Sequence, residues 1–144
     1  CQDMPNLYSM TSWPDLLGLV DYFLPNAREA MHITGTENVA DALETLRGWV
    51  KVAAVVKDGE NGAWIATQDA VQHVPGVPVK NVVDTTGAGD SFNAGFLYGL
   101  MHENTLDICA KYGNICGGIS VTHVGGSTGA PREAELLDWI ARLG

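Results

Sequence analysis

The stretch NVVDTTGAGDSFNAGFLYGL, Asn81 to Leu100, places Gly87 and Gly89 directly before an aspartate, Asp90. Apolar residues then recur at helical spacing and predict a helix from Asp90 to Met101: Phe92, Phe96, Leu97 and Leu100. The amides that open a helix have no intrahelical acceptor, and the helix dipole is positive at that end. The amides of Gly87, Ala88, Gly89 and Asp90 are therefore predicted to form a cradle for an anion.

Glycine spacing alone leaves a second interpretation open, in which the glycines only permit a tight strand-to-helix turn and Asp90 caps the helix. A dinucleotide-binding fingerprint would need a third glycine where Phe92 stands, so that interpretation fails. A serine hydrolase would use Ser91 as nucleophile and a histidine as base. No recognisable partner motif surrounds any histidine of the chain, which are His32, His73, His102 and His123.

Length and charge narrow the class of protein. With 144 residues, of which 46% are hydrophobic, residues 1–144 are predicted to form a single domain with its own core. The formal net charge of -9 argues against nucleic acid or an anionic membrane as the main partner. An anionic ligand must then be held by local features such as a helix N-terminus, a lysine or a metal ion.

The three cysteines form no CxxC pair, and Cys109 and Cys116 fall within a helical pattern. They are predicted to be buried small apolar residues rather than disulfide partners or metal ligands, which favours a cytoplasmic location. No segment has the length of a membrane span, and no signal-peptide pattern is present. The chain begins at Cys1 without an initiator methionine, so we expect it to be part of a longer protein.

Strands and helices alternate on both sides of the glycine stretch. Upstream, helices are predicted at Trp13–Val20, 26–33 and Val39–Val50, with a brief buried strand in DYFLPN. KVAAVVK has the continuous apolar run of a strand covered on both faces, and the strands AWIAT and VQHVP follow the turn DGENG. Downstream, helices are predicted at Thr105–Val121 and Glu133–Leu143, with the loop HVGGSTGAP between them. This alternation predicts an α/β fold with an open, largely parallel sheet.

The segment DTTGAGDSFNAGFL, Asp84 to Leu97, resembles the C-terminal signature of the ribokinase-like (PfkB) carbohydrate and nucleoside kinases. PNAREA resembles the N-x-x-E motif of that family, VVKDGENGA its nucleotide-side turn, and GNICGGISVTHVGG its C-terminal helix and loop. The resemblance implies a three-layer α/β/α ribokinase-like fold, of which this chain is the C-terminal half. DMPN, at Asp3 to Asn6, is similar to a mid-chain stretch of sugar kinases, while the N-terminal half with its sugar-contacting residues and lid is not matched.

The resemblance assigns roles at the glycine stretch. Asp90 corresponds to the catalytic base that takes the proton of the acceptor hydroxyl, and the amides of Gly87, Ala88 and Gly89 would stabilise charge on the transferring phosphoryl group. Asn26 and Glu29 correspond to the pair that organises Mg²⁺, its waters and the phosphates. A plain helix cap at Asn26 is compatible with that role.

The same comparison implies a nucleotide side. Gly59 and Gly62 would lie against the phosphates of ATP, and Asn114 near the adenine. Lys57 stands where many relatives have threonine; a phosphate contact and a solvated lysine at a strand end both stay open. The small residues around Asn114, at Gly113, Gly117 and Gly118, would admit the base, and close helix packing explains them equally well.

Several members of the family also bind K⁺ beside the anion cradle. The matching positions are Asp84, Thr86 and, through backbone oxygens, Ser120, His123 and Gly125. The sequence thus predicts an ATP- and Mg²⁺-dependent kinase that phosphorylates a small sugar, with K⁺ as an additional ligand and a homodimer as an expectation for the whole protein. A nucleotide-binding module without catalysis, and a nucleoside or vitamin kinase of the same fold, are the alternatives.

Overall fold

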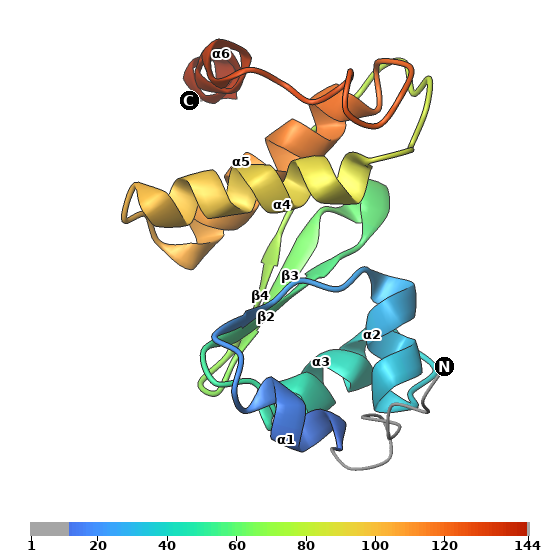
Figure 1. The fold of residues 1–144 in the computed structure, drawn as a ribbon, viewed down its shortest axis with the longest axis vertical. Coiled ribbons are helices and arrows are strands. Elements are labelled where there is room, and N and C mark those ends of the chain that lie inside the picture. The colour runs from blue at the N-terminus through green and yellow to red at the C-terminus, as the bar shows by residue number, and fades with distance from the viewer. Residues whose placement is uncertain (1–11, 144) are drawn as a thin grey trace, which may run out of the picture. The chain divides into compact units, whose positions relative to one another are not determined.

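The computed structural model describes residues 12–143, so the predictions at Cys1 and at Asp3–Asn6 lie outside the described residues (Figure 1). The chain divides into two compact units. Within the described range, unit 1 holds residues 12–56 and 66–71, and unit 2 holds residues 57–65 and 72–143. That residues 1–144 form a single domain stays a prediction.

Four strands form one sheet in the order β1-β2-β3-β4: β1 (Tyr22–Phe23), β2 (Ala53–Lys57), β3 (Ala63–Thr67) and β4 (Val71–Val74). β1 pairs in parallel with β2, so that Tyr22 lies opposite Ala53 and Phe23 opposite Ala54. Short turns join β2 to β3 and β3 to β4, a connection that only antiparallel neighbours permit, so the sheet is mixed. β2 is buried over its first four residues, as its apolar run predicts, whereas β1 is only half-buried and shorter than expected.

Unit 1 contains the helices α1 (Trp13–Leu17), α2 (Ala27–Thr34) and α3 (Val39–Arg47). Each begins at a capping side chain, because Ser12, Asn26 and Asn38 accept a hydrogen bond from the third residue after them. Buried Ala42, Leu43 and Leu46 give α3 its core face. Both α1 and α3 end earlier than predicted, and each is followed by glycine, a residue of low helix propensity.

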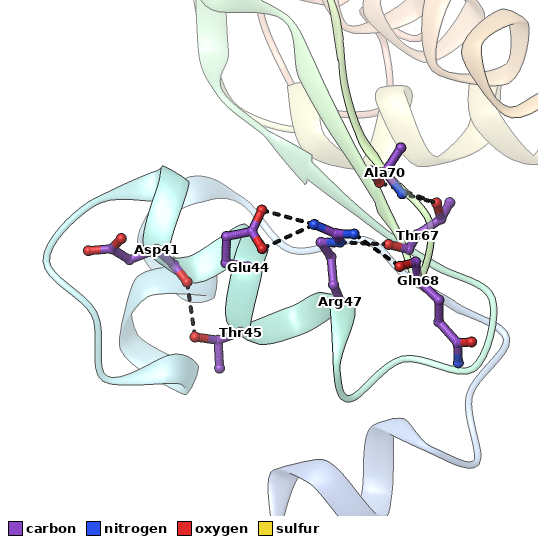
Figure 2. A network of polar contacts seen from close by, with 7 residues as sticks. All are labelled: Asp41, Glu44, Thr45, Arg47, Thr67, Gln68 and Ala70. Atoms are coloured by element: carbon purple, nitrogen blue, oxygen red, sulfur yellow. Dashed lines mark hydrogen bonds and ion pairs between the residues drawn. The ribbon is translucent and has the colours of Figure 1, made fainter.

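Arg47, the last residue of α3, ties the helix to the turn between β3 and β4 (Figure 2). Its guanidinium donates from Nε to the Thr67 carbonyl at 3.0 Å and from Nη2 to the Gln68 carbonyl at 3.0 Å. Nη1 donates to both carboxylate oxygens of Glu44, at 3.1 and 3.0 Å. The turn is closed by the Thr67 amide, which donates to the Ala70 carbonyl at 2.9 Å. Arg47 therefore fixes the backbone of this turn within unit 1.

In unit 2, α4 (Ala88–Met101) and α5 (Leu106–Ser120) lie side by side (Figure 1). Glycines allow the close approach. A Cβ on Gly95 would lie 2.6 Å from the Tyr112 carbonyl oxygen and 2.7 Å from Cys116 Sγ, and one on Gly99 would lie 2.8 Å from Cys109 Cα. Both helices are confirmed, and α4 begins before Asp90 because Gly87 is its N-cap.

The core of unit 2 lies along the same helix pair. Phe96 is fully buried, and the ring of Phe92 packs 2.8 Å from where a Cβ on Gly113 would stand. Close helix packing therefore explains Gly113. Cys109 and Cys116 are buried and free, as the sequence predicts.

The C-terminal part of unit 2 is the loop that follows α5 and the helix α6 (Glu133–Leu143), whose bounds match the prediction. Leu136 is the buried residue of α6 and packs with Ile115, Cys116 and Ile119. The Tyr98 hydroxyl donates to Glu133 Oε1 at 2.7 Å, which links α4 to the start of α6. None of the helices within residues 12–143 is long and apolar enough to cross a membrane.

Candidate functional site

The glycine loop turns sharply at Gly87, which has a φ of 77° in the left-handed region. A Cβ at Gly87 would also lie 2.6 Å from Gly126 Cα, so both conformation and space require glycine there. The loop around Gly126 therefore packs directly against Gly87. This turn brings the first residues of α4, a helix of 14 residues, to the surface.

The amides of this turn are partly open. Within the described range, the amides of Gly87, Gly89 and Asp90 donate to no other group, whereas the Ala88 amide donates to the Thr85 carbonyl at 3.2 Å. The predicted cradle therefore has one amide fewer than the sequence suggested, because Ala88 closes a turn with Thr85. Gly89 and Asp90 are exposed, so an anion can approach their amides from solvent.

The side chain of Asp90 is solvent-exposed and makes no hydrogen bond or ion pair within residues 12–143. It stands in the first turn of α4, where Gly87 and not Asp90 is the N-cap. The interpretation of Asp90 as a helix cap is therefore wrong. A carboxylate in this position is accessible to the hydroxyl of a bound molecule, as a general base must be.

Lys57 reaches the same place from the end of β2. Its ammonium lies 3.5 Å from where a Cβ on Gly89 would stand, and it donates to Asn93 Oδ1 at 3.1 Å. Asn93 was not predicted as a site residue. It stands three positions after Asp90, hence on a neighbouring position of the same helix face, and that spacing is the signal that could have indicated it. The structure thus places a cation beside the open amides.

The turn after β2 is a 3₁₀ segment, η2 (Gly59–Asn61), which is followed by Gly62. Its first residue and Gly62 both have positive φ: 55° at Gly59 and 96° at Gly62. The Asp58 amide donates to the Gly62 carbonyl at 2.8 Å and closes it. A Cβ on Gly62 would overlap the Val74 carbonyl oxygen and the Gly76 amide nitrogen. Gly62 is therefore needed for close packing against the chain that leaves β4.

Asn114 is buried and binds the same segment, the chain that leaves β4. Its Nδ2 donates to the carbonyls of Val74 and Pro75, each at 3.0 Å. The amide donors of Asn114 are thus engaged with the protein. Among its small neighbours, Gly118 faces Val77 Cγ2 at 2.6 Å from a built Cβ, and Gly117 faces the Ala88 carbonyl at 3.3 Å, so both also serve packing.

Asn26 and Glu29 lie in unit 1, both exposed, and form a reciprocal capping box. Glu29 donates its amide to Asn26 Oδ1 at 2.8 Å, and the Asn26 amide donates to Glu29 Oε2 at 2.9 Å. The carboxylate of Glu29 is held by one oxygen only; within residues 12–143, Oε1 accepts no hydrogen bond. The box therefore fixes the direction of a carboxylate that still has one open oxygen.

Asp84 links the glycine loop to the C-terminal loop. Its Oδ1 accepts from the Thr86 amide at 2.9 Å and its Oδ2 from the Gly125 amide at 3.0 Å. The hydroxyl and amide of Thr86 and the amide of Gly125 lower the pKa of Asp84 below its usual value. The negative charge of Asp84 is thus stabilised at the base of the cradle.

Three further residues were predicted to give backbone oxygens to K⁺: Ser120, His123 and Gly125. The Ser120 carbonyl accepts the His123 amide, and the Gly125 carbonyl accepts the Gly129 amide, each at 3.2 Å. Within the described part of the chain, no group of three or more His, Cys, Asp or Glu side chains is placed to hold a metal ion. Of these three residues, Gly125 is the one bound to Asp84, through its amide and not its carbonyl.

Comparison with known proteins places this chain in a family. The family model described as pfkB family carbohydrate kinase matches residues 3–133. A ribokinase of Haemophilus influenzae is 33% identical over 136 residues, which are 88% of this chain and 42% of that protein. A cytidine kinase of Thermococcus kodakarensis is 37% identical over 101 residues, 69% of this chain and 36% of that protein.

Solved structures of ribokinases are also similar to this chain. A ribokinase from Thermotoga maritima superposes with a TM-score of 0.83 at 27% identity, over 89% of this chain and 44% of that one. A ribokinase from Arabidopsis thaliana, in complex with ribose and ATP, has a TM-score of 0.79 at 26% identity, over 87% of this chain and 42% of its own. The chain spans less than half the length of these relatives. Because the family model covers most of its residues, the chain has the ribokinase-like α/β fold and belongs to the pfkB family of carbohydrate kinases.

Proposed function

We propose that this chain is the nucleotide-binding and catalytic C-terminal portion of an ATP-dependent kinase, which transfers the γ-phosphoryl group of ATP to a hydroxyl of a small sugar. The observation that carries the proposal is the start of α4. There an exposed carboxylate, Asp90, adjoins the open amide of Gly89, and the Lys57 ammonium lies beside them. Phosphoryl transfer requires these elements: a base, hydrogen-bond donors and positive charge.

In this proposal, Asp90 accepts the proton of the acceptor hydroxyl as that oxygen attacks the γ-phosphorus. The amides of Gly87 and Gly89 donate to the oxygens of the transferring group, and the Ala88 amide joins them on release from Thr85. Lys57, oriented by its bond to Asn93, binds a phosphate oxygen as a point charge.

ATP would lie with its phosphates against the turn of Gly59 and Gly62, while Asn114 fixes the chain that lines this turn. Mg²⁺ neutralises charge on the phosphates when bound, keeps several of its waters and needs few carboxylates. Glu29, with one open oxygen and a direction set by Asn26, fits such a water-mediated contact. K⁺ would bind at Asp84 and Thr86 with backbone oxygens of the loop at Ser120, His123 and Gly125.

The acceptor is proposed to be a sugar because the relatives include ribokinases and 2-dehydro-3-deoxygluconokinases. One solved relative is a fructokinase with fructose and ADP bound. A nucleoside acceptor is the alternative, favoured by the cytidine kinase among the relatives and by an adenosine kinase among the similar structures. Dimerisation of the whole protein and a cytoplasmic location stay predictions.

Calorimetric titration with Mg-ATP tests the nucleotide site of the chain itself. We expect binding by the wild type and by Asp90→Asn, since Asp90 acts on the acceptor and not on the nucleotide. In a full-length protein containing this chain, the kinase further requires ADP formation that depends on a sugar. A chain that binds Mg-ATP but whose full-length form produces no ADP with any sugar or nucleoside would instead be a nucleotide-binding module without catalysis.

A further inference from the structure

The turn that follows β2 is contacted by two aromatic rings that no sequence motif indicated. Trp64 in β3 and His73 in β4 stack with their ring centroids 4.2 Å apart and their planes at 27°. His73 Nε2 lies 2.7 Å from the carbonyl oxygen of Asn61, the last residue of η2. Since a carbonyl oxygen only accepts, Nε2 is the donor.

The second ring acts on the other end of the turn. The indole N–H of Trp64 donates to Asp58 Oδ2 at 3.4 Å, and the same oxygen accepts from Asn61 Nδ2 at 3.3 Å. Asp58 directly precedes η2 and is its N-cap without a side-chain cap bond of its own. The stacked pair therefore contacts both ends of the turn, Asp58 through Trp64 and Asn61 through His73.

The residues after His73 are fixed as well. Gly62 packs against Val74 and Gly76, and buried Asn114 binds the carbonyls of Val74 and Pro75. His73 thus projects from a strand end that is anchored to α5. A ring on such a base can hold Asn61 in one position, between two glycines whose backbones tolerate more conformations than those of other residues.

We propose that His73, stacked on Trp64, is a positioning residue that presets the turn Asp58–Gly62 for the phosphates of the nucleotide. This inference rests on the proposed function, in which Gly59 and Gly62 lie against those phosphates. A flexible turn must be ordered when a ligand binds, and ordering it beforehand raises affinity. His73 touches neither the reacting atoms nor the open amides of α4, so its effect is on nucleotide affinity.

Single substitutions separate the two contacts of His73. His73→Phe keeps a ring for Trp64 but removes the donor, and His73→Gln keeps a donor for the Asn61 carbonyl without the ring. Gln72→Ala changes an exposed neighbour on the same strand and is the matched control. We expect His73→Phe to weaken Mg-ATP binding by calorimetry about fivefold, the value of one hydrogen bond, and Gln72→Ala to leave it unchanged.

Hydrogen exchange of the amides at 58–62 supplies a readout that does not depend on the nucleotide. We expect faster exchange there in His73→Phe, near-native exchange in His73→Gln, and equal melting temperatures for all variants. Native affinity or native exchange in His73→Phe would overturn the proposal. If the wild type itself fails to bind Mg-ATP, the proposed function is wrong, and the exchange rates still decide whether His73 presets the turn. If His73→Phe does not fold, His73→Leu, which also removes the donor to the Asn61 carbonyl, takes its place.

Discussion

At the scale of single residues, the site depends on which polar groups are already satisfied. Asp90 is an exposed carboxylate at the start of α4 and has no bonding partner within residues 12–143. Asp84, six positions earlier, has a backbone amide on each carboxylate oxygen. Two aspartates of one motif therefore have different tasks: Asp84 supports the loop, and Asp90 is open to chemistry.

Asp90→Asn tests the second task in a full-length protein that contains this chain. Loss of a general base typically lowers the rate about 10²- to 10⁴-fold, so we expect kcat for sugar-dependent ADP formation to fall by that factor while Mg-ATP binding is retained. Asp69→Asn, in the exposed turn between β3 and β4, is the control and should leave kcat unchanged. A fall of less than about threefold for Asp90→Asn would exclude it as the base.

Asp84→Asn tests the first task through the pH dependence of stability. The pKa of Asp84 is lowered in the folded protein, so the carboxylate adds stability above its unfolded pKa of about 3.9 and loses it as the pH falls through the folded value. We expect Asp84→Asn to lower the melting temperature most at neutral pH, with the difference from wild type shrinking below about pH 4. An equal difference at all pH values would show that ionisation of Asp84 is irrelevant to the loop.

Local sequence was sufficient to predict some residues and not others. The positions of Gly87, Gly89 and Asp90 follow from a short motif, because a turn into a helix depends on neighbouring residues. The bond between Lys57 and Asn93 joins residues 36 positions apart, so it depends on the tertiary fold and not on neighbouring sequence. Occupation of the Ala88 amide by Thr85 depends on the turn geometry, which residue types alone do not specify.

At the scale of elements, the contact between α4 and α5 orients the start of α4. Gly95 lies in this contact, where an added methyl group would overlap the backbone of Tyr112 and the sulfur of Cys116. We expect Gly95→Ala to destabilise the protein by about 1–3 kcal/mol, measured by urea unfolding. Gly48→Ala is the matched control: Gly48 has a φ of -77° with only the Thr45 carbonyl oxygen near, at 3.5 Å, so the change should be neutral or slightly stabilising.

The chemical reactivity of Cys109 and Cys116 tests the same contact between α4 and α5. Burial raises the pKa of Cys116 to about 11 and also raises that of Cys109, so little thiolate is present at neutral pH. We expect neither to react with iodoacetamide in the native protein and both to react in urea, as measured by peptide mapping. Rapid native labelling of Cys116 would mean that α4 and α5 separate readily in solution.

The periodicity of apolar residues predicted which segments are helices and which are strands, but it did not always predict where they end. α6 was predicted with its observed bounds, but α1 and α3 were predicted too long because apolar residues continue beyond Gly18 and Gly48. The pairing of Trp64 with His73 was not predicted, since alternation along a strand does not show which cross-strand side chains stack.

At the scale of the whole molecule, the motifs were sufficient to predict the family, which is confirmed over residues 3–133. The two compact units were not indicated, because the sequence has no linker and the boundaries between the units fall within or beside β2, β3 and β4. A boundary between units that falls inside a strand is not accompanied by a change in amino-acid composition.

Coverage of less than half of the relatives leads to a prediction about activity. We expect the 144-residue chain to bind Mg-ATP but to phosphorylate sugars at a small fraction of the rate of a full-length protein that contains it, since in the proposed function residues outside this chain help to bind the acceptor. Coupled ADP detection on both proteins measures this. Comparable rates would mean that the chain holds a complete acceptor site.

The bonds of Arg47 have a consequence for engineering. Two of its donors bind the main-chain oxygens of residues 67 and 68, which any amino acid supplies. We therefore expect substitutions to be poorly tolerated at Arg47 and well tolerated at the tip of the hairpin. Asp69, exposed at that tip, is accordingly a suitable attachment point for a fluorescent dye through an introduced cysteine. Such a label would leave the hydrogen bonds between Arg47 and the hairpin intact.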